Sequence, residues 1–388
     1  MNKNRGRTSL YIDQFTKQTK KLNEAACGDQ FLIKRFSDYT VYILCDGIGS
    51  GIKGSIAATM CANRILNLVE ANISLINIAC RIANLMHRAR SERIPFSTFT
   101  IVKILNNGQF NILCYENPIP FLLTGQECLD LEVDYFTCDL EVIGQISGRL
   151  REDDSLIIFT DGVSQAGLGR IPGLGWGREN IQNYLVHLQQ KDIDQNDILD
   201  AIFATVRQLS GGRFTDDVTA TILNARKAKT FSIMSGPPQK KEDDEEYIDL
   251  FMNDSGKKAL CGSTTADIAS RILKRKVEVI QISPSFARPP EYSIEGIDIV
   301  TEGTVTLNQV YNILERDPST YDNQSCVSTI AKHIHEADSI KVYWGHATNT
   351  AHQDTSFIQM GILERNLIMP LLIEKLQKLG KTVEVINF

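Results

Sequence analysis

Two aspartates that directly end apolar runs are the residues of this sequence with the clearest chemical potential. The run VYILC leads into Asp46 and Gly47, and the run LIIF leads into Thr160, Asp161 and Gly162. Such runs, rich in β-branched and aromatic residues and stopped by glycine, predict buried strands. A buried carboxylate without a partner is costly, so each aspartate needs a cation or several hydrogen-bond donors beside it.

Two further acidic positions share this context. Asp29 precedes the strand-like segment FLIKRF, and Asp216 with Asp217 precedes the apolar segment VTATIL. For any single Asp-Gly pair a solvated turn is the commoner explanation, because turns favour both residues. If the strands of Asp46 and Asp161 are neighbours in one sheet, their carboxylates converge and repel one another unless cations lie between them. All-oxygen ligands select magnesium or manganese, and two such ions can activate a water for attack on a phosphoryl group.

The elements that must position these acids alternate between hairpins and helix pairs. The turn at 106–108, Asn-Asn-Gly, separates two segments of alternating polarity and predicts antiparallel strands with one buried face. Helical spacing follows the Asp46 turn over 54–70 and about 73–92. Two more helices are predicted over 178–190 and 195–209, after a glycine-rich loop.

Taken together, the segments GDQ, VYILCDGIGSG, LIIFTDGVSQAG and TDDVTATIL resemble the metal-dependent type-2C protein phosphatases. The resemblance is closest to the bacterial branch named for sporulation protein E, and it covers roughly residues 20–225. It implies an α+β fold, an α-β-β-α sandwich of two antiparallel sheets. It also implies a protein serine/threonine phosphatase with two divalent cations, Mn2+ or Mg2+. The implied partner is a phosphorylated, anti-anti-sigma-like protein in bacterial partner-switching signalling.

The resemblance assigns roles to five residues of the sequence. Asp46 would bridge both metal ions, Asp29 would lie on one side of the pair, and Asp161 and Asp216 would complete the other side. The backbone carbonyl of Gly47 would join the second ion. Asp46 and Asp161 would then take part in catalysis through a metal-bound water.

Three features depart from the family pattern. Asp217 occupies a place where many relatives have asparagine, so it is expected to support the ligands from the second shell around the ions. Ile48 follows the Asp-Gly pair where many eukaryotic relatives carry histidine, a candidate general acid. Leaving-group protonation would then fall to a metal-bound or solvent water. Neither Arg5, Arg7 nor the pair Lys20–Lys21 is a clear counterpart of the family's phosphate-binding arginine.

The sequence pattern changes near residue 225. From there predicted strands and helices alternate, which favours a separate α/β domain with a mostly parallel sheet. We therefore predict a metal-dependent phosphatase domain over 1–225 and a sensor or partner-docking domain over 226–388.

Polar turns with glycine follow three predicted strands of the second domain. Their candidate ligand-binding residues are Ser263, Thr264, Thr265, Glu302, His346, His352 and Asp354. In open α/β sheets ligands bind beyond the carboxyl ends of the strands, and the free N–H groups that open a helix can receive a small anionic ligand. Ordinary helix capping by serine and threonine is the slightly favoured explanation of the first turn. The spacing of the two histidines and Asp354 matches no standard metal site.

Composition excludes several classes of protein. The 388 residues are 43% hydrophobic and 23% charged, with a net charge of −6, so nothing favours nucleic-acid binding. No apolar run approaches the roughly 18 residues of a membrane span, and the first residues lack the apolar core of a signal peptide. The nine cysteines include no C-x-x-C pair. We expect a reduced, cytoplasmic protein without a disulfide framework.

Two rival hypotheses stand beside the phosphatase. The first is a catalytically degenerate phosphatase-fold module that binds a partner and senses a ligand through residues 226–388. The complete acid set argues against it, because a degenerate enzyme is expected to have lost at least one ligand. The second is that the C-terminal domain is itself an enzyme acting on a phosphorylated or anionic metabolite.

Overall fold

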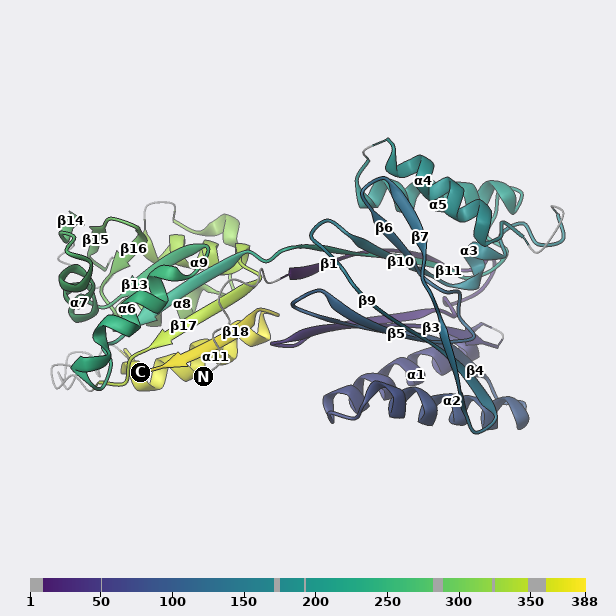
Figure 1. Cartoon of the computed structure of the whole chain (residues 1–388), viewed down its shortest axis with the longest axis horizontal. Coiled ribbons are helices and arrows are strands. Elements are labelled where there is room, and N and C mark those ends of the chain that lie inside the picture. The colour runs from purple at the N-terminus through teal and green to yellow at the C-terminus, as the bar shows by residue number, and fades with distance from the viewer. Residues whose placement is uncertain are drawn as a thin grey trace. The chain divides into compact units, whose positions relative to one another are not determined.

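The computed structural model describes residues 10–49, 51–170, 175–191, 193–281, 289–322, 325–347 and 361–388 (Figure 1). The chain divides into two compact units, Met1–Lys227 and Ala228–Phe388. In the described ranges, no helix is both long enough and apolar enough to cross a membrane.

The N-terminal unit contains two antiparallel sheets. One has the order β1 (Leu10–Thr19), β11 (Val218–Lys227), β10 (Ser155–Phe159), β6 (Phe121–Thr124) and β7 (Glu127–Asp130). The other has the order β2 (Gln30–Arg35), β3 (Tyr39–Ile48), β4 (Phe96–Leu105), β5 (Gln109–Tyr115), β9 (Glu141–Arg149) and β8 (Asp134–Cys138). The predicted pair of antiparallel sheets in an α+β fold is confirmed.

Helices cover the outer face of each sheet (Figure 1). Those on the six-stranded sheet are α1 (Ile52–Glu70) and α2 (Leu75–Ser91), and those on the five-stranded sheet are α3 (Asp161–Ser164), α4 (Arg178–Gln189) and α5 (Gln195–Leu209). The helices predicted after Asp46 and after the glycine-rich loop are therefore confirmed.

Strand β3 has no polar face, because both of its sides are covered. Val41 and Ile43 pack against the helices, whereas Tyr42 and Leu44 pack in the core between the two sheets. Successive side chains of a strand point to opposite faces, so a strand in a middle layer needs apolar residues at every position. This explains the unbroken run that leads into Asp46.

Two features of this unit differ from the sequence expectations. Residues 10–19 form the long strand β1, which no sequence expectation covered, because the polar residues of LYIDQFTKQT hide the strand pattern. Cys80 in α2 and Cys138 at the end of β8 form a disulfide with a Cα–Cα distance of 5.3 Å. The expectation of a reduced protein without a disulfide framework is therefore wrong for this pair, which folding brings together across 58 residues of sequence.

The C-terminal unit is a doubly wound α/β domain. Its sheet has the order β14 (Glu278–Gln281), β15 (Glu291–Ile294), β16 (Ile297–Thr301), β13 (Lys257–Cys261), β12 (Thr230–Ser235), β17 (Ser339–Trp344) and β18 (Thr382–Asn387). The five strands from β16 to β18 are mutually parallel, and β14 and β15 add an antiparallel edge. The predicted mostly parallel sheet is confirmed.

Helices cover both faces of this sheet. One hydrophobic core includes α8 (Thr304–Ile313), α9 (Cys326–Glu336) and α11 (Arg365–Lys378), and the other includes α6 (Asp244–Asn253) and α7 (Ser263–Leu273). Two short 3-10 helices span Lys241–Asp243 and Pro318–Thr320.

Candidate active site

The two aspartates that end apolar strands come from different sheets. Asp46 lies near the end of β3 in the six-stranded sheet, and Asp161 directly follows β10 in the five-stranded sheet region. The idea that their strands are neighbours in one sheet is therefore wrong. The acids meet instead between the two sheets. Asp29 Oδ2 accepts a hydrogen bond from Thr160, the residue before Asp161, and a Cβ on Gly28 would lie 3.3 Å from the carbonyl oxygen of Gly47, the residue after Asp46.

Asp29 is the most deeply buried acid of the group. Its side chain is 3% exposed, and its Oδ2 accepts hydrogen bonds from Thr160 Oγ1 at 2.9 Å and Thr219 Oγ1 at 2.6 Å. Its Oδ1 is buried without a hydrogen-bond partner among the described residues. A buried acceptor of this kind usually has a partner, so Oδ1 is an oxygen that a bound cation could use as a ligand.

The electrostatics of the cluster disfavour charge on three of its acids, Asp29, Asp46 and Asp216. Burial, followed by the charges of Asp29 and Asp161, raises the pKa of Asp46 far above its usual range. Burial also raises the pKa of Asp29, against the two threonine hydroxyls that lower it. The pKa of Asp216 is raised by burial and by Asp161, and Lys21 opposes this increase. The protein alone therefore cannot keep the whole cluster ionised at neutral pH.

This donor set fits hard divalent cations. Carboxylate oxygens are the ligands that magnesium and manganese prefer, and ions between the acids would remove the repulsion that raises their pKa values. They would also give Asp29 Oδ1 the partner it lacks. As the side chains stand, no group of three or more His, Cys, Asp or Glu in the described ranges is arranged to hold an ion. Metal-free carboxylates that repel one another are expected to stand apart.

Asp217 contacts two other segments of the chain near the site, one at Lys21 and one at Gly162. Asp217 Oδ1 accepts from the backbone N–H of Lys21 at 2.9 Å, and its own N–H donates to Asp216 Oδ1 at 3.0 Å. A Cβ on Gly162 would lie 1.9 Å from the carbonyl oxygen of Asp217, so only glycine permits this approach. Ile48, two residues after Asp46, is 39% exposed, and its side chain has no proton to donate.

Sequence reasoning missed the hydroxyl and amide groups that orient the acids. Thr160 and Thr219 hold Asp29, and Gln165 Nε2 donates to Asp161 Oδ2 at 2.9 Å. A signal was available for Thr160 and Gln165, since they flank Asp161 closely in the sequence. Thr219 gave none, because its partner Asp29 is 190 residues away.

Replacing Thr219 by valine is expected to weaken metal binding about 10- to 100-fold, the usual effect of losing a group that orients a ligand. The hydroxyl that stabilises the charged form of Asp29 would be lost, so ionising that carboxylate would become harder. Manganese affinity measured by calorimetry checks this. The control is Thr221→Val, two residues further along β11, where the hydroxyl contacts Tyr42 Oη at 2.6 Å. Equal affinities in the two variants would contradict the assigned role of Thr219.

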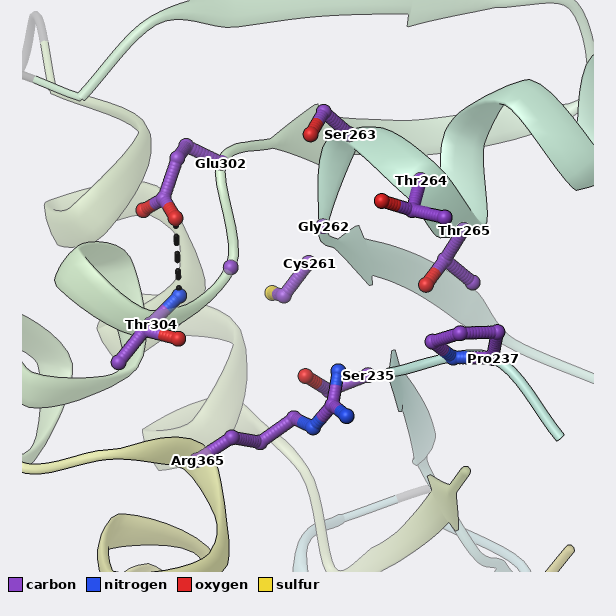
Figure 2. Close-up of a pocket in the computed structure, with 11 residues that line it drawn as sticks. Ser235, Pro237, Cys261, Gly262, Ser263, Thr264, Thr265, Glu302, Thr304 and Arg365 are labelled. Carbon is purple, nitrogen blue, oxygen red and sulfur yellow. Dashed lines mark hydrogen bonds between the residues drawn. The ribbon is translucent and has the colours of Figure 1, made fainter. Parts of the chain in front are cut away.

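The residues singled out in the C-terminal domain are brought together only in part. Ser263, Thr264, Thr265 and Glu302 line one cavity (Figure 2). His346 is not among its lining residues; its Nε2 contacts Asn387 Oδ1 at 2.9 Å, and its ring lies against Trp344. His352 and Asp354 lie outside the described residues. Sequence reasoning missed Ser235, Pro237 and Arg365, which complete the cavity wall.

Comparison with known proteins gives one family match. The family described as Stage II sporulation protein E (SpoIIE) matches residues 37–226. This range includes Asp46, Asp161 and Asp216 and begins after Asp29. No curated protein sequence matches the chain.

Several solved structures are similar to the N-terminal part of the chain. The PP2C phosphatase domain with a regulatory-domain fragment of SpoIIE from Bacillus subtilis is 16% identical, with a TM-score of 0.47 and coverage of 57% of this chain and 63% of that one. The RsbU and RsbW domains of a Mycobacterium tuberculosis protein are 15% identical, with a TM-score of 0.46 and the same coverages of 57% and 63%. The chain thus spans less than two thirds of either structure. RsbX in complex with magnesium is 18% identical, with a TM-score of 0.39 and coverage of 56% and 99%.

The assignment rests on the sequence match and on the fold already described. The matched range runs from the hairpin that delivers Asp46 to the strand that follows Asp216. It lies within the unit with two antiparallel sheets and outer helices. The N-terminal domain of this chain therefore belongs to the SpoIIE family.

Proposed function

We propose that the chain is a protein serine/threonine phosphatase that hydrolyses phosphoserine or phosphothreonine with the help of two divalent cations, Mn2+ or Mg2+. The observation that carries the proposal is the cluster of Asp29, Asp46, Asp161 and Asp216, whose mutual repulsion and burial raise the pKa of three of its members. A set of acids that destabilises the metal-free protein is best explained by cations that bind it.

The residues of the chain would divide the work as follows. Asp46 would bridge the ions, with Asp29 on one side and Asp161, Asp216 and the carbonyl of Gly47 on the other. A bound pair of divalent cations supplies an activated water and neutralises a phosphoryl group. The chain itself fixes the ligands: two hydroxyls hold the Asp29 carboxylate, and a glutamine amide holds that of Asp161. Ile48 supplies no proton to a leaving group, so water must do so.

The partner that we propose is a phosphorylated, anti-anti-sigma-like protein in bacterial partner switching, met in the cytoplasm. Family membership supports a phosphatase in signalling, and the substrate protein itself is our proposal. The rival hypothesis of a degenerate binding module has less support, because all four acids are present and lie close enough for their charges to act on one another.

The direct test is hydrolysis by the purified full-length chain. With manganese or magnesium, the protein is expected to release phosphate from an aryl phosphate and from a phosphoserine protein, and a chelator is expected to stop both reactions. If neither substrate is hydrolysed with either metal, the enzyme hypothesis fails and the binding module becomes the better explanation.

The stability of the metal-free protein is expected to fall as the pH rises. Asp29 and Asp46 have pKa values raised above their unfolded value near 4, so the folded state holds their protons more tightly. Their stabilising contribution is complete below about pH 4 and is lost as the pH rises toward the raised pKa values. The check is urea unfolding in the presence of chelator at about pH 5 and about pH 8. The unfolding free energy of the wild type should fall more between these two pH values than that of Asp46→Asn.

Metal should reverse this trend. At about pH 8, manganese at 100 times its Kd is expected to add about 2.7 kcal/mol to the unfolding free energy, and much less at about pH 5, where protons compete for the ligands. The same urea titrations with manganese check this. A metal effect that is equal at both pH values would contradict ligation by these carboxylates.

A further inference from the structure

The cavity of the C-terminal domain lies at the carboxyl ends of its parallel strands. Its wall includes Ser235 at the end of β12, Cys261 at the end of β13 and Glu302 directly after β16 (Figure 2). The chain adds β13 and β16 on one side of β12 and then crosses to add β17 and β18 on the other. Ligands of open α/β sheets bind in the crevice where the strand order reverses in this way.

Helix α7 points the free N–H groups of its first turn at this cavity. It has 11 residues and begins after Gly262, with no side-chain cap among the described residues. The N–H groups of Ser263, Thr264 and Thr265 therefore have no partner within the helix, and all three residues line the cavity. Such a helix start favours a bound anion. The neighbouring helix α8 differs, because Glu302 accepts from the N–H groups of Thr304 at 3.1 Å and Val305 at 2.9 Å.

Two polar atoms without a hydrogen-bond partner, one on each of two residues of the same wall, point independently to a ligand. Ser235 is 0% exposed, and its Oγ has no hydrogen-bond partner among the described residues. The Nε of Arg365 is likewise buried and without a partner. Buried donors left unpaired are rare and costly, so an acceptor that enters the cavity would satisfy both.

The position of Arg365 depends on a glycine at the end of β12. Gly236 has φ +82°, a conformation that side chains rarely adopt, and a Cβ there would lie 2.5 Å from the guanidinium carbon of Arg365. The guanidinium thus lies against the backbone, and Figure 2 shows it beside Ser235. It also donates to the carbonyl of Ala347. A planar guanidinium held in this way suits the oxygens of a phosphoryl group.

The size of the cavity sets the size of the group that fits it. Its volume is about 60 Å³, roughly the volume that two water molecules occupy in the liquid, which is enough for a compact anionic group. An adjoining cavity of about 410 Å³ shares Pro237 and Thr264 with it and is also lined by Pro238, Ile268 and Arg271. That volume is in the range of sites for small organic ligands, and its proline and isoleucine wall suits an apolar or flat body.

We propose that the C-terminal domain binds a small phosphate monoester. The phosphoryl group lies between the start of α7, Ser235 and Arg365, and the organic part occupies the adjoining cavity of Pro237, Pro238 and Ile268. A phosphoryl group fits better than a single carboxylate, because the donors come from three separate elements and its oxygens point in several directions. Glu302 in the same wall accepts hydrogen bonds from the N–H groups of Thr304 and Val305, and Figure 2 shows its carboxylate turned toward the start of α8.

The test is calorimetric titration of the full-length chain with chelator present, so that the N-terminal acids hold no metal that could bind phosphate. The probes are inorganic phosphate, ribose 5-phosphate and adenosine monophosphate, with ribose and adenosine as partners that lack the phosphoryl group. We expect phosphate to bind, at least one ester to bind more tightly than phosphate, and neither ribose nor adenosine to bind.

Two variants locate the site. Arg365→Leu is expected to weaken binding at least 10-fold, and Arg316→Leu, an exposed arginine outside both cavities, is expected to leave it unchanged. Ser235→Ala is expected to weaken binding several-fold without lowering the Tm of the ligand-free protein, because it removes an unpaired buried hydroxyl. The Ser235 variant keeps the test valid if Arg365→Leu fails to fold.

Three results would overturn the proposal. The first is that phosphate does not bind, or binds equally to wild type and both cavity variants. The second is that neither ester binds more tightly than phosphate, which removes the role of the adjoining cavity. The third is that adenosine or ribose binds as tightly as its phosphate ester. None of these results bears on the metal centre, whose activity is measured separately.

Discussion

Replacing Asp46 by asparagine is expected to reduce hydrolysis at least 1,000-fold while the fold survives. This follows from the proposed role of Asp46 as the bridge between two ions. Asparagine has nearly the same shape but no charge, and metal ions contribute several kcal/mol of transition-state stabilisation, with about 1.4 kcal/mol for each factor of ten. Steady-state hydrolysis of an aryl phosphate at saturating manganese measures the loss.

The fold should persist because the substitution removes repulsion. The pKa of Asp46 is raised by burial and by its neighbours Asp29 and Asp161, so a neutral amide is easier to accommodate than a carboxylate above about pH 5. Circular dichroism and urea unfolding check this point. The matched control is Asp153→Asn in the exposed turn before β10, at φ +70°, a conformation that asparagine tolerates well. Full activity in the Asp46 variant would sink the assignment of the metal centre.

Much of this site could be predicted because its signals are local. The run that ends at Asp46 and the run that ends at Asp161 each predict a buried strand, since both faces of their strands are covered. Local patterns do not say which strands pair. No local pattern could place β3 and β10 in different sheets, because that choice depends on hydrogen-bond partners far away in the chain.

The contacts that complete each site are the least predictable from sequence. Thr219 donates a hydrogen bond to Asp29, 190 residues away in the sequence. Arg365 likewise lines a cavity together with Ser235, which lies far earlier in the chain. Nothing in the residue types identifies these pairs, since threonines and arginines are usually exposed or cap local backbone. The Cys80–Cys138 disulfide was missed for the same reason, because only the packing of α2 beside β8 brings the two sulfurs together.

Gly162→Ala is expected to have the largest effect on stability, about 2–3 kcal/mol, because the new Cβ would overlap a neighbouring backbone. It would lie 1.9 Å from the carbonyl oxygen of Asp217 and 3.0 Å from its carbonyl carbon, and neither atom can move by a simple side-chain rotation. The two segments that carry Asp161 and Asp216 would have to separate. Urea unfolding of the metal-free protein measures the loss.

A second consequence distinguishes this clash from a general loss of stability. Since Gly162 directly follows Asp161 and contacts Asp217, the shift should displace ligands from both segments and weaken manganese binding as well. The matched control is Gly125→Ala in the β6–β7 turn, where φ is +55° and no atom lies within 4 Å of the new Cβ. There only the backbone conformation is penalised, by about 1–2 kcal/mol, and metal affinity should be unchanged. If Gly162→Ala keeps wild-type affinity for manganese, the close approach of Gly162 to Asp217 serves packing alone, and the metal centre does not depend on it.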